Sequence, residues 1–159
     1  MKAASLKDIQ AELENLSQQE LLALCLRLGK FKKENKELLT YLLFESFDEQ
    51  AYVDNIKKEI TEQFAAINTD SLYFVKKSAR KILRMISKYS RYNGSAVVEV
   101  QLLLHFCRAL KEGGFAHTSS QALNNIFSSQ LKKIEKTVSG LHEDLQYDYL
   151  KELKPLMHT

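Results

Sequence analysis

Apolar residues recur every three or four positions along almost the whole chain, which places them on one face of an α-helix. This pattern predicts seven or eight helices, through residues 6–16, 21–28, 38–44, 53–67, 72–86, 96–110, 123–138 and 141–156. No segment of useful length alternates apolar and polar residues as a half-buried strand does. The sequence therefore predicts an all-α fold of antiparallel helices, packed as an irregular bundle or a short α-solenoid.

The residues between these segments are typical of helix starts and stops. Ser5 and Ser17 are each followed three residues later by an acid, as in a capping box. Gly94 is expected to end one long helix, and Pro155 is expected to help end the last one. Because the connections are short, we expect a single helical domain over residues 1–159.

A weak internal similarity is compatible with a duplicated four-helix unit. Residues 21–28 (LLALCLRL) and 103–110 (LLHFCRAL) share a Leu-Leu pair, a cysteine and a final leucine at matching offsets. Two leucine-rich helices would also produce this similarity by chance. The duplication hypothesis divides the chain into about 1–69 and 70–159, as the alternative to one domain without repeats.

Two segments carry more apolar residues than one helix face requires. Residues 96–110 are apolar nearly all round, so this helix should be the most buried. Residues 32–47 (KKENKELLTYLLFESF) combine a basic start with a dense apolar end. They predict either a central helix packed on two sides or an interface for a partner or a second copy. The candidate interface residues are Tyr41, Phe44 and Phe47.

Residues 76–92 (KKSARKILRMISKYSRY) hold seven Lys and Arg and no acid. On a helix, six of these cations fall within a sector of about 100°, opposite the apolar row of residues 72–86, over about 21 Å. Like charges four residues apart repel, so this basic stripe indicates a counterpart. Its candidate binding residues for a polyanion or a protein partner are Lys77, Arg80, Lys81, Arg84, Lys88, Arg91 and Tyr92.

Several counterparts remain open for the basic stripe. It could be a solvated face, or it could pair with the acids of residues 44–50 and 142–148. It could also bind an acidic protein surface, a second copy, or a nucleic acid or other polyanion. Four lysines within residues 30–36 would strengthen polyanion binding if they shared one surface with the stripe. The net charge is only +3, so these alternatives depend on where the charge lies.

The chain lacks the motifs of familiar catalytic and metal sites. His105 and Cys107, two positions apart on a helix, point in different directions and should not share a metal; His105 is expected to be a buried or hydrogen-bonded neutral histidine. No phosphate-binding loop, zinc motif or nucleophile–base spacing is found, so we expect no enzyme, cofactor or metal.

The cysteines and the hydropathy bear on the compartment. Cys25 and Cys107 each sit in an apolar run and are expected to be buried thiols in a reducing compartment. No apolar run approaches the roughly 20 residues of a membrane span. These features predict a cytoplasmic protein that does not bind membranes.

The favoured hypothesis is a non-catalytic helical interaction module, an adaptor or scaffold that binds another protein or associates with itself as a homodimer. The alternative is nucleic-acid or polyanion binding through the basic helix 76–92. A small enzyme with a pocket among the second, third and sixth predicted helices (21–28, 38–44 and 96–110) is a third hypothesis.

Overall fold

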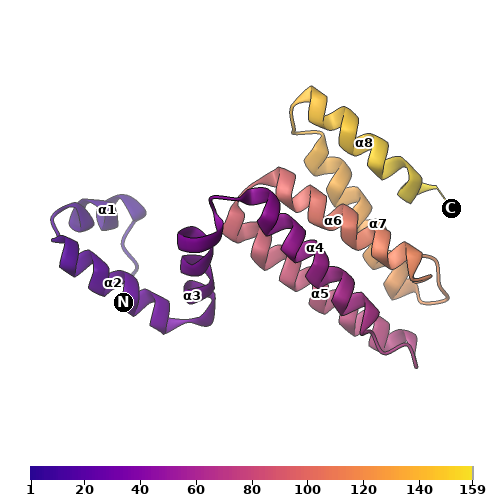
Figure 1. The fold of residues 1–159 in the computed structure, drawn as a ribbon, viewed down its shortest axis with the longest axis horizontal. Coiled ribbons are helices and arrows are strands. Elements are labelled where there is room, and N and C mark those ends of the chain that lie inside the picture. Colours follow the sequence, from indigo (N-terminus) through magenta and orange to yellow (C-terminus); the bar gives the residue numbers. More distant parts are fainter. Residues whose placement is uncertain (159) are drawn as a thin grey trace. The chain divides into compact units, whose positions relative to one another are not determined.

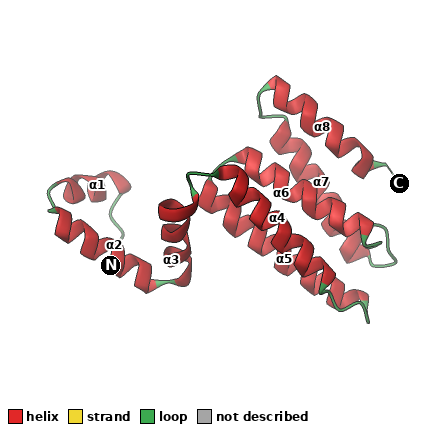
Figure 2. Ribbon diagram, viewed as in Figure 1, coloured by secondary structure: helices red, strands yellow, loops and turns green. Residues whose placement is uncertain are grey.

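A computed structural model describes residues 1–158 of the chain, and within this range it contains eight α-helices, one short π-helix and no strand (Figures 1 and 2). The predicted all-α fold is confirmed. The elements are α1 (Leu6–Glu14), α2 (Gln18–Phe31), α3 (Lys33–Thr40), the π-helix η1 (Tyr41–Glu45), α4 (Glu49–Ala65), α5 (Leu72–Asn93), α6 (Ala96–Glu112), α7 (Gln121–Val138) and α8 (Glu143–Met157).

The helices form two compact units, which are described separately. The N-terminal unit, Met1–Glu45, contains α1 to α3 and η1, and the C-terminal unit contains α4 to α8 from Ser46 onward. The expectation of one domain, and the alternative of a duplication near residue 69, stay predictions.

The C-terminal unit is built around α6, which packs against α4, α5, α7 and α8 (Figure 1). This confirms the prediction that residues 96–110 form the most buried helix. Fully burying one large apolar side chain contributes about 1.5–3 kcal/mol, so α6 is the main source of stability in this unit. Its buried residues are Val98, Val100, Leu102, Leu103, Leu104, Phe106, Cys107 and Leu110.

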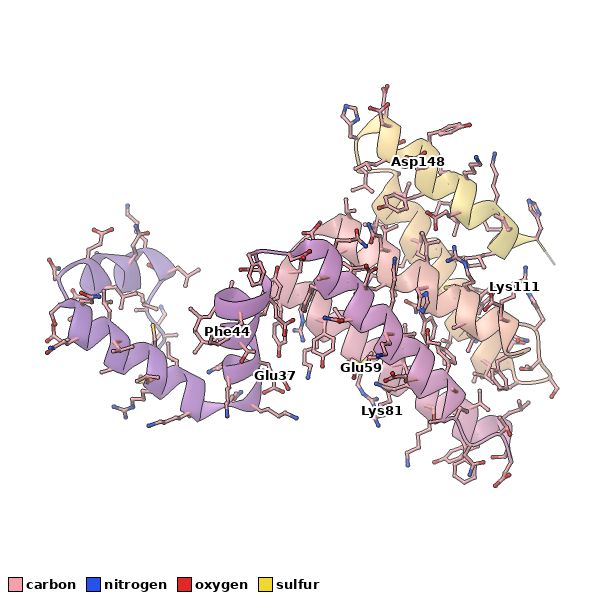
Figure 3. The ribbon with its side chains drawn as sticks, viewed as in Figure 1. Glu37, Phe44, Glu59, Lys81, Lys111 and Asp148 are labelled. Carbon is pink, nitrogen blue, oxygen red and sulfur yellow. The ribbon has the colours of Figure 1, made fainter. Side chains whose placement is uncertain are left out.

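Polar side chains connect α6 to α8 along the length of both helices. Gln101 donates a hydrogen bond to the Tyr149 hydroxyl at 2.9 Å. Nearer the C-terminal end of both helices, the Arg108 guanidinium lies 3.1 Å from the Glu152 carboxylate. The Lys111 ammonium then donates to the carbonyl oxygens of Pro155 at 2.8 Å and His158 at 2.6 Å (Figure 3). Because the residue numbers rise together on both helices, α6 and α8 run parallel.

Several helix ends follow the signals in the sequence. Ser5 and Ser17 both form complete capping boxes, and Gly94 ends α5 in the left-handed conformation with φ 79°. Helix α8 passes through Pro155 and ends two residues later at Met157, so the expectation that Pro155 helps to end it stays a prediction. Proline lacks only one backbone donor, and in the last turn of a helix this removes a single intrahelical hydrogen bond.

The N-terminal unit has almost no core of its own. No side chain of α1, α2 or α3 is buried, and only Tyr41 is buried in η1. Helix α2 packs against α3 across a sharp turn at Lys32, where the backbone is extended. The Asn35 side chain donates to the Leu28 carbonyl at 2.8 Å and fixes this turn. A Cβ on Gly29 would lie 3.0 Å from Leu39, so the glycine allows the two helices to approach closely.

Candidate functional site

The basic stripe lies on the solvent face of α5, as its periodicity predicts. Its exposed cations are Lys77, Arg80, Lys81 (labelled in Figure 3), Arg84 and Arg91. The opposite face of the helix is buried against α4 and α6 through Val75, Ala79, Ile82 and Ile86. The two faces of α5 therefore separate charge from core.

These five exposed cations make no ion pair and no side-chain hydrogen bond with the residues described, 1–158. Three acids of residues 44–50 and 142–148 make other contacts within the C-terminal unit. The Asp48 carboxylate accepts from the Ala51 backbone N–H at 3.0 Å and caps α4, and Glu49 accepts from Asn93 at 3.1 Å. Asp144 lies 3.5 Å from the ring of His142. Pairing of these cations with residues 44–50 or 142–148 is therefore not observed.

The remaining two members of the stripe are less accessible. Lys88 and Tyr92 are both half-buried. The Lys88 ammonium lies over the ring of Tyr89, 5.1 Å from its centroid, and the rings of Tyr89 and Tyr92 pack 6.1 Å apart. The accessible charge of α5 is therefore concentrated in the five cations on its outer face.

The N-terminal unit exposes nearly all of its large apolar side chains. Leu22, Phe31 and Leu43 retain 60%, 75% and 68% of their accessible surface. A unit of this size rarely builds a sufficient core without a disulfide, a metal or a partner chain. The other exposed apolar side chains of the unit include Leu6, Ile9, Leu13, Leu21, Leu24, Leu26, Leu28, Leu38, Leu42 and Phe44.

A groove of about 600 Å³ lies between α2 and α3 within this unit. Its apolar wall is formed by Leu26, Leu39, Leu43 and Phe44, the last labelled in Figure 3. Its basic residues are Lys30, Lys32, Lys33 and Lys36. We call this feature the α2–α3 groove. Its chemistry suits a ligand that is apolar on one side and anionic along its edge.

The sequence did not predict this groove, although it marked the lysines. The sequence suggests that the four lysines extend the basic stripe of α5, but the two basic segments belong to different units. The groove depends on the extended backbone at Lys32, which turns α3 back onto α2. The one sequence signal was the break in apolar periodicity between residues 28 and 38.

The three predicted interface residues differ in their exposure and in the unit to which they belong. Tyr41 is buried, whereas Phe44 and Phe47 are 66% and 84% exposed. Phe44 belongs to the N-terminal unit and Phe47 to the C-terminal unit. Helix α3 continues directly into the π-helix η1, so residues 33–45 are helical throughout, but this segment is not packed on two sides because Leu42, Leu43 and Phe44 are exposed.

The two cysteines differ, and the prediction that both are buried is wrong for one of them. Cys107 is buried in α6, and burial raises the pKa of its thiol to about 12. Cys25 is exposed on α2 because the leucines around it enclose no core. The same leucine-rich pattern therefore surrounds an exposed cysteine in the N-terminal unit and a buried cysteine in the C-terminal unit.

His105 is half-buried at the edge of α6, with its Nε2 2.8 Å from the Thr61 hydroxyl. Burial lowers the pKa of this histidine, and the nearby charges of Lys57 and Arg108 lower it further. The imidazole is therefore neutral at pH 7, as predicted. It lines a small polar cleft with Lys57, Gln101 and Arg108.

No protein-family model, curated protein or solved structure matches this chain. Within residues 1–158, no helix combines the length and the apolar character needed to cross a membrane.

Proposed function

We propose that this chain is a non-catalytic helical interaction module whose N-terminal unit docks onto another protein chain. The observation that carries this proposal is the exposure of almost every large apolar side chain in residues 1–45. Covering such surface contributes about 25 cal/mol for each Å² removed from water. An adaptor or scaffold of this kind consists of a well-packed unit joined to a unit that exposes the docking surface.

The C-terminal unit is the well-packed part of this proposed module. Its helices α4 to α8 bury their apolar faces against one another, and large exposed apolar side chains are fewer there. Monomeric proteins rarely leave wide apolar patches in contact with water, and such patches usually mark contact surfaces. The contrast between the two units supports docking through the N-terminal one.

Photo-crosslinking in cells tests this proposal. Replacing Phe31 with the photoreactive analogue benzoylphenylalanine adds a crosslinker at an exposed aromatic position of α2. We expect covalent adducts with a protein chain after irradiation, because the side chain lies in the docking surface. The matched control is the same analogue at Tyr147, which is 71% exposed on α8. Equal or fewer adducts at position 31 than at position 147 would reject the proposal.

A second candidate function is binding of a nucleic acid or another polyanion through α5. It is supported by the five exposed cations that have no ion pair among residues 1–158, on a helix without acids. Regularly spaced cations along about 21 Å of helix can neutralise several phosphates, and each neutralised phosphate releases counterions.

Fluorescence anisotropy with labelled DNA and RNA, at a series of salt concentrations, tests this second candidate. The double substitution R80E/R84E should weaken binding about tenfold or more. The slope of log K against log salt concentration should become less steep by about one for each lost phosphate contact. The control K151E/K154E makes the same charge change at exposed positions of α8. Equal effects of the two variants would show that only net charge matters, which would contradict a specific role for α5.

A further inference from the structure

We infer that the chain forms a symmetric dimer in which α1 of each copy lies in the α2–α3 groove of the other. This inference rests on the proposed function, because it names the occupant of the docking surface. The structure supplies both halves of the contact within one chain. A symmetric dimer would form the same contact twice and would need no other component.

Helix α1 has the shape and chemistry of a groove ligand. Its apolar residues Leu6, Ile9 and Leu13 fall on one face and are exposed. The carboxylates of Glu12 and Glu14 flank that face on its two sides, and both are exposed. An isolated helix of this length is marginal in water, so α1 gains stability when its apolar face is covered.

The α2–α3 groove complements α1 in both respects. Its wall is apolar and it is lined by four lysines, of which Lys33 lies 3.6 Å from the Glu37 carboxylate, whereas α1 is apolar on one face and holds three acids and one lysine, Lys7. The separation of charge is marked along the chain. Helix α1 holds three acids and one lysine, a net charge of −2, and residues 27–36 hold five Lys and Arg and one acid. Opposite charges around an apolar contact fix its orientation and exclude wrong partners.

A second copy is favoured over the same chain as the source of this helix. No residue of α1 lines the groove of its own chain. Within its own chain α1 also leaves Leu6 84% exposed. If each of two copies placed its α1 in the groove of the other, both the helix and the groove would be covered. The packing of α2 against α3 in each copy would not change.

Charge reversal on each side of the contact tests the dimer. The first variant is E12K/E14K, which changes the flanks of α1 and leaves the capping box of Ser5 and Asp8 intact. The second is K32E/K36E, which changes the groove. Acids are favourable near the N-terminus of α3, so this second variant should keep its helix. Circular dichroism should show equal helix content in all chains.

Sedimentation equilibrium of the full chain over about 1–100 μM gives the dimer dissociation constant. We expect wild type and the control K151E/K154E to dimerise. Each reversal variant alone should dimerise about tenfold or more weakly, because every dimer then places like charges together at both contacts. Mixing the two reversal variants in equal amounts should restore wild-type affinity, because both contacts then pair opposite charges again.

Three outcomes would overturn the inference. The wild-type chain could remain a monomer throughout this range, the reversal variants could dimerise as tightly as wild type, or their mixture could fail to recover. A monomer that pellets with phosphatidylserine vesicles through the same lysines would instead assign the groove to a membrane surface. A monomer that still forms adducts with other proteins at position 31 would reject the dimer while leaving the proposed function intact. A monomer that also forms no more adducts at position 31 than at position 147 would reject both.

Discussion

At the scale of single residues, the two cysteines separate the two environments of this protein. Cys107 is enclosed in α6 with its thiol pKa raised to about 12, whereas Cys25 is exposed on α2. Since the thiolate is the reactive form, we expect one thiol per chain to react with a disulfide reagent at pH 8 and the second only after unfolding. Mass spectrometry of the labelled peptides would identify the site. Labelling of Cys107 in the folded chain would contradict the burial of α6.

His105 predicts a pH dependence of stability at the same scale. Its pKa in the folded state lies below the ordinary value of 6.5, because burial and nearby cations disfavour the charged form. The folded state therefore binds fewer protons than the unfolded state. Its contribution to stability is complete above about pH 6.5 and is lost as the pH falls through the folded-state pKa.

Urea unfolding at pH 7.5 and pH 5 measures this dependence. The H105Q variant keeps a polar group near Thr61 but cannot be protonated. Its free energy of unfolding should therefore fall less between the two pH values than that of wild type. An identical fall in both chains would assign the pH dependence to other groups.

At the scale of helices, the glycine that ends α5 shows how a single position stops a long helix. Gly94 has φ 79°, in the left-handed region that other residues enter at a cost. Replacing it with alanine should lower the free energy of unfolding by about 1 kcal/mol, although a Cβ would meet no atom there. The control is Gly140→Ala, where φ is not positive and the added Cβ makes only an ordinary contact. Thermal unfolding of both variants checks the difference.

Most helices could be predicted from the sequence because they have a regular apolar face and a clear start or stop. Helix α3 is the exception: the apolar pattern predicts a helix over 38–44, whereas α3 begins at Lys33 after Lys32, which makes no side-chain capping bond. Ser5 and Ser17 begin helices where expected, and Gly94 ends one. The placement of the charges of α5 followed from the same periodicity. What periodicity cannot tell is which apolar face will find a neighbour in the same chain. The exposed Cys25 and the α2–α3 groove are the results of that ambiguity.

At the scale of the whole molecule, stability should be concentrated in the C-terminal unit. Phe106 is fully buried and packs against Phe64 with ring centroids 5.4 Å apart, whereas Phe31 is 75% exposed. We expect Phe106→Ala to lower the free energy of unfolding by about 3–5 kcal/mol. The matched change Phe31→Ala should alter it by about 0.5 kcal/mol or less. Urea unfolding at a low protein concentration, followed by circular dichroism, measures both. Similar losses would show that the N-terminal unit has a core of its own.

The contacts between α6 and α8 also have a consequence for the end of the chain. Three polar contacts follow one another in the same order along both helices: Gln101 with Tyr149, Arg108 with Glu152, and Lys111 with the carbonyl of Pro155. Sliding α8 by one helical turn, about 5.4 Å, would place Leu145 or Leu153 where Tyr149 accepts from Gln101, and neither side chain is an acceptor. Leucines alone would tolerate such a shift, because one leucine can replace another in a neighbouring hole. The polar contacts therefore select one register for the last helix.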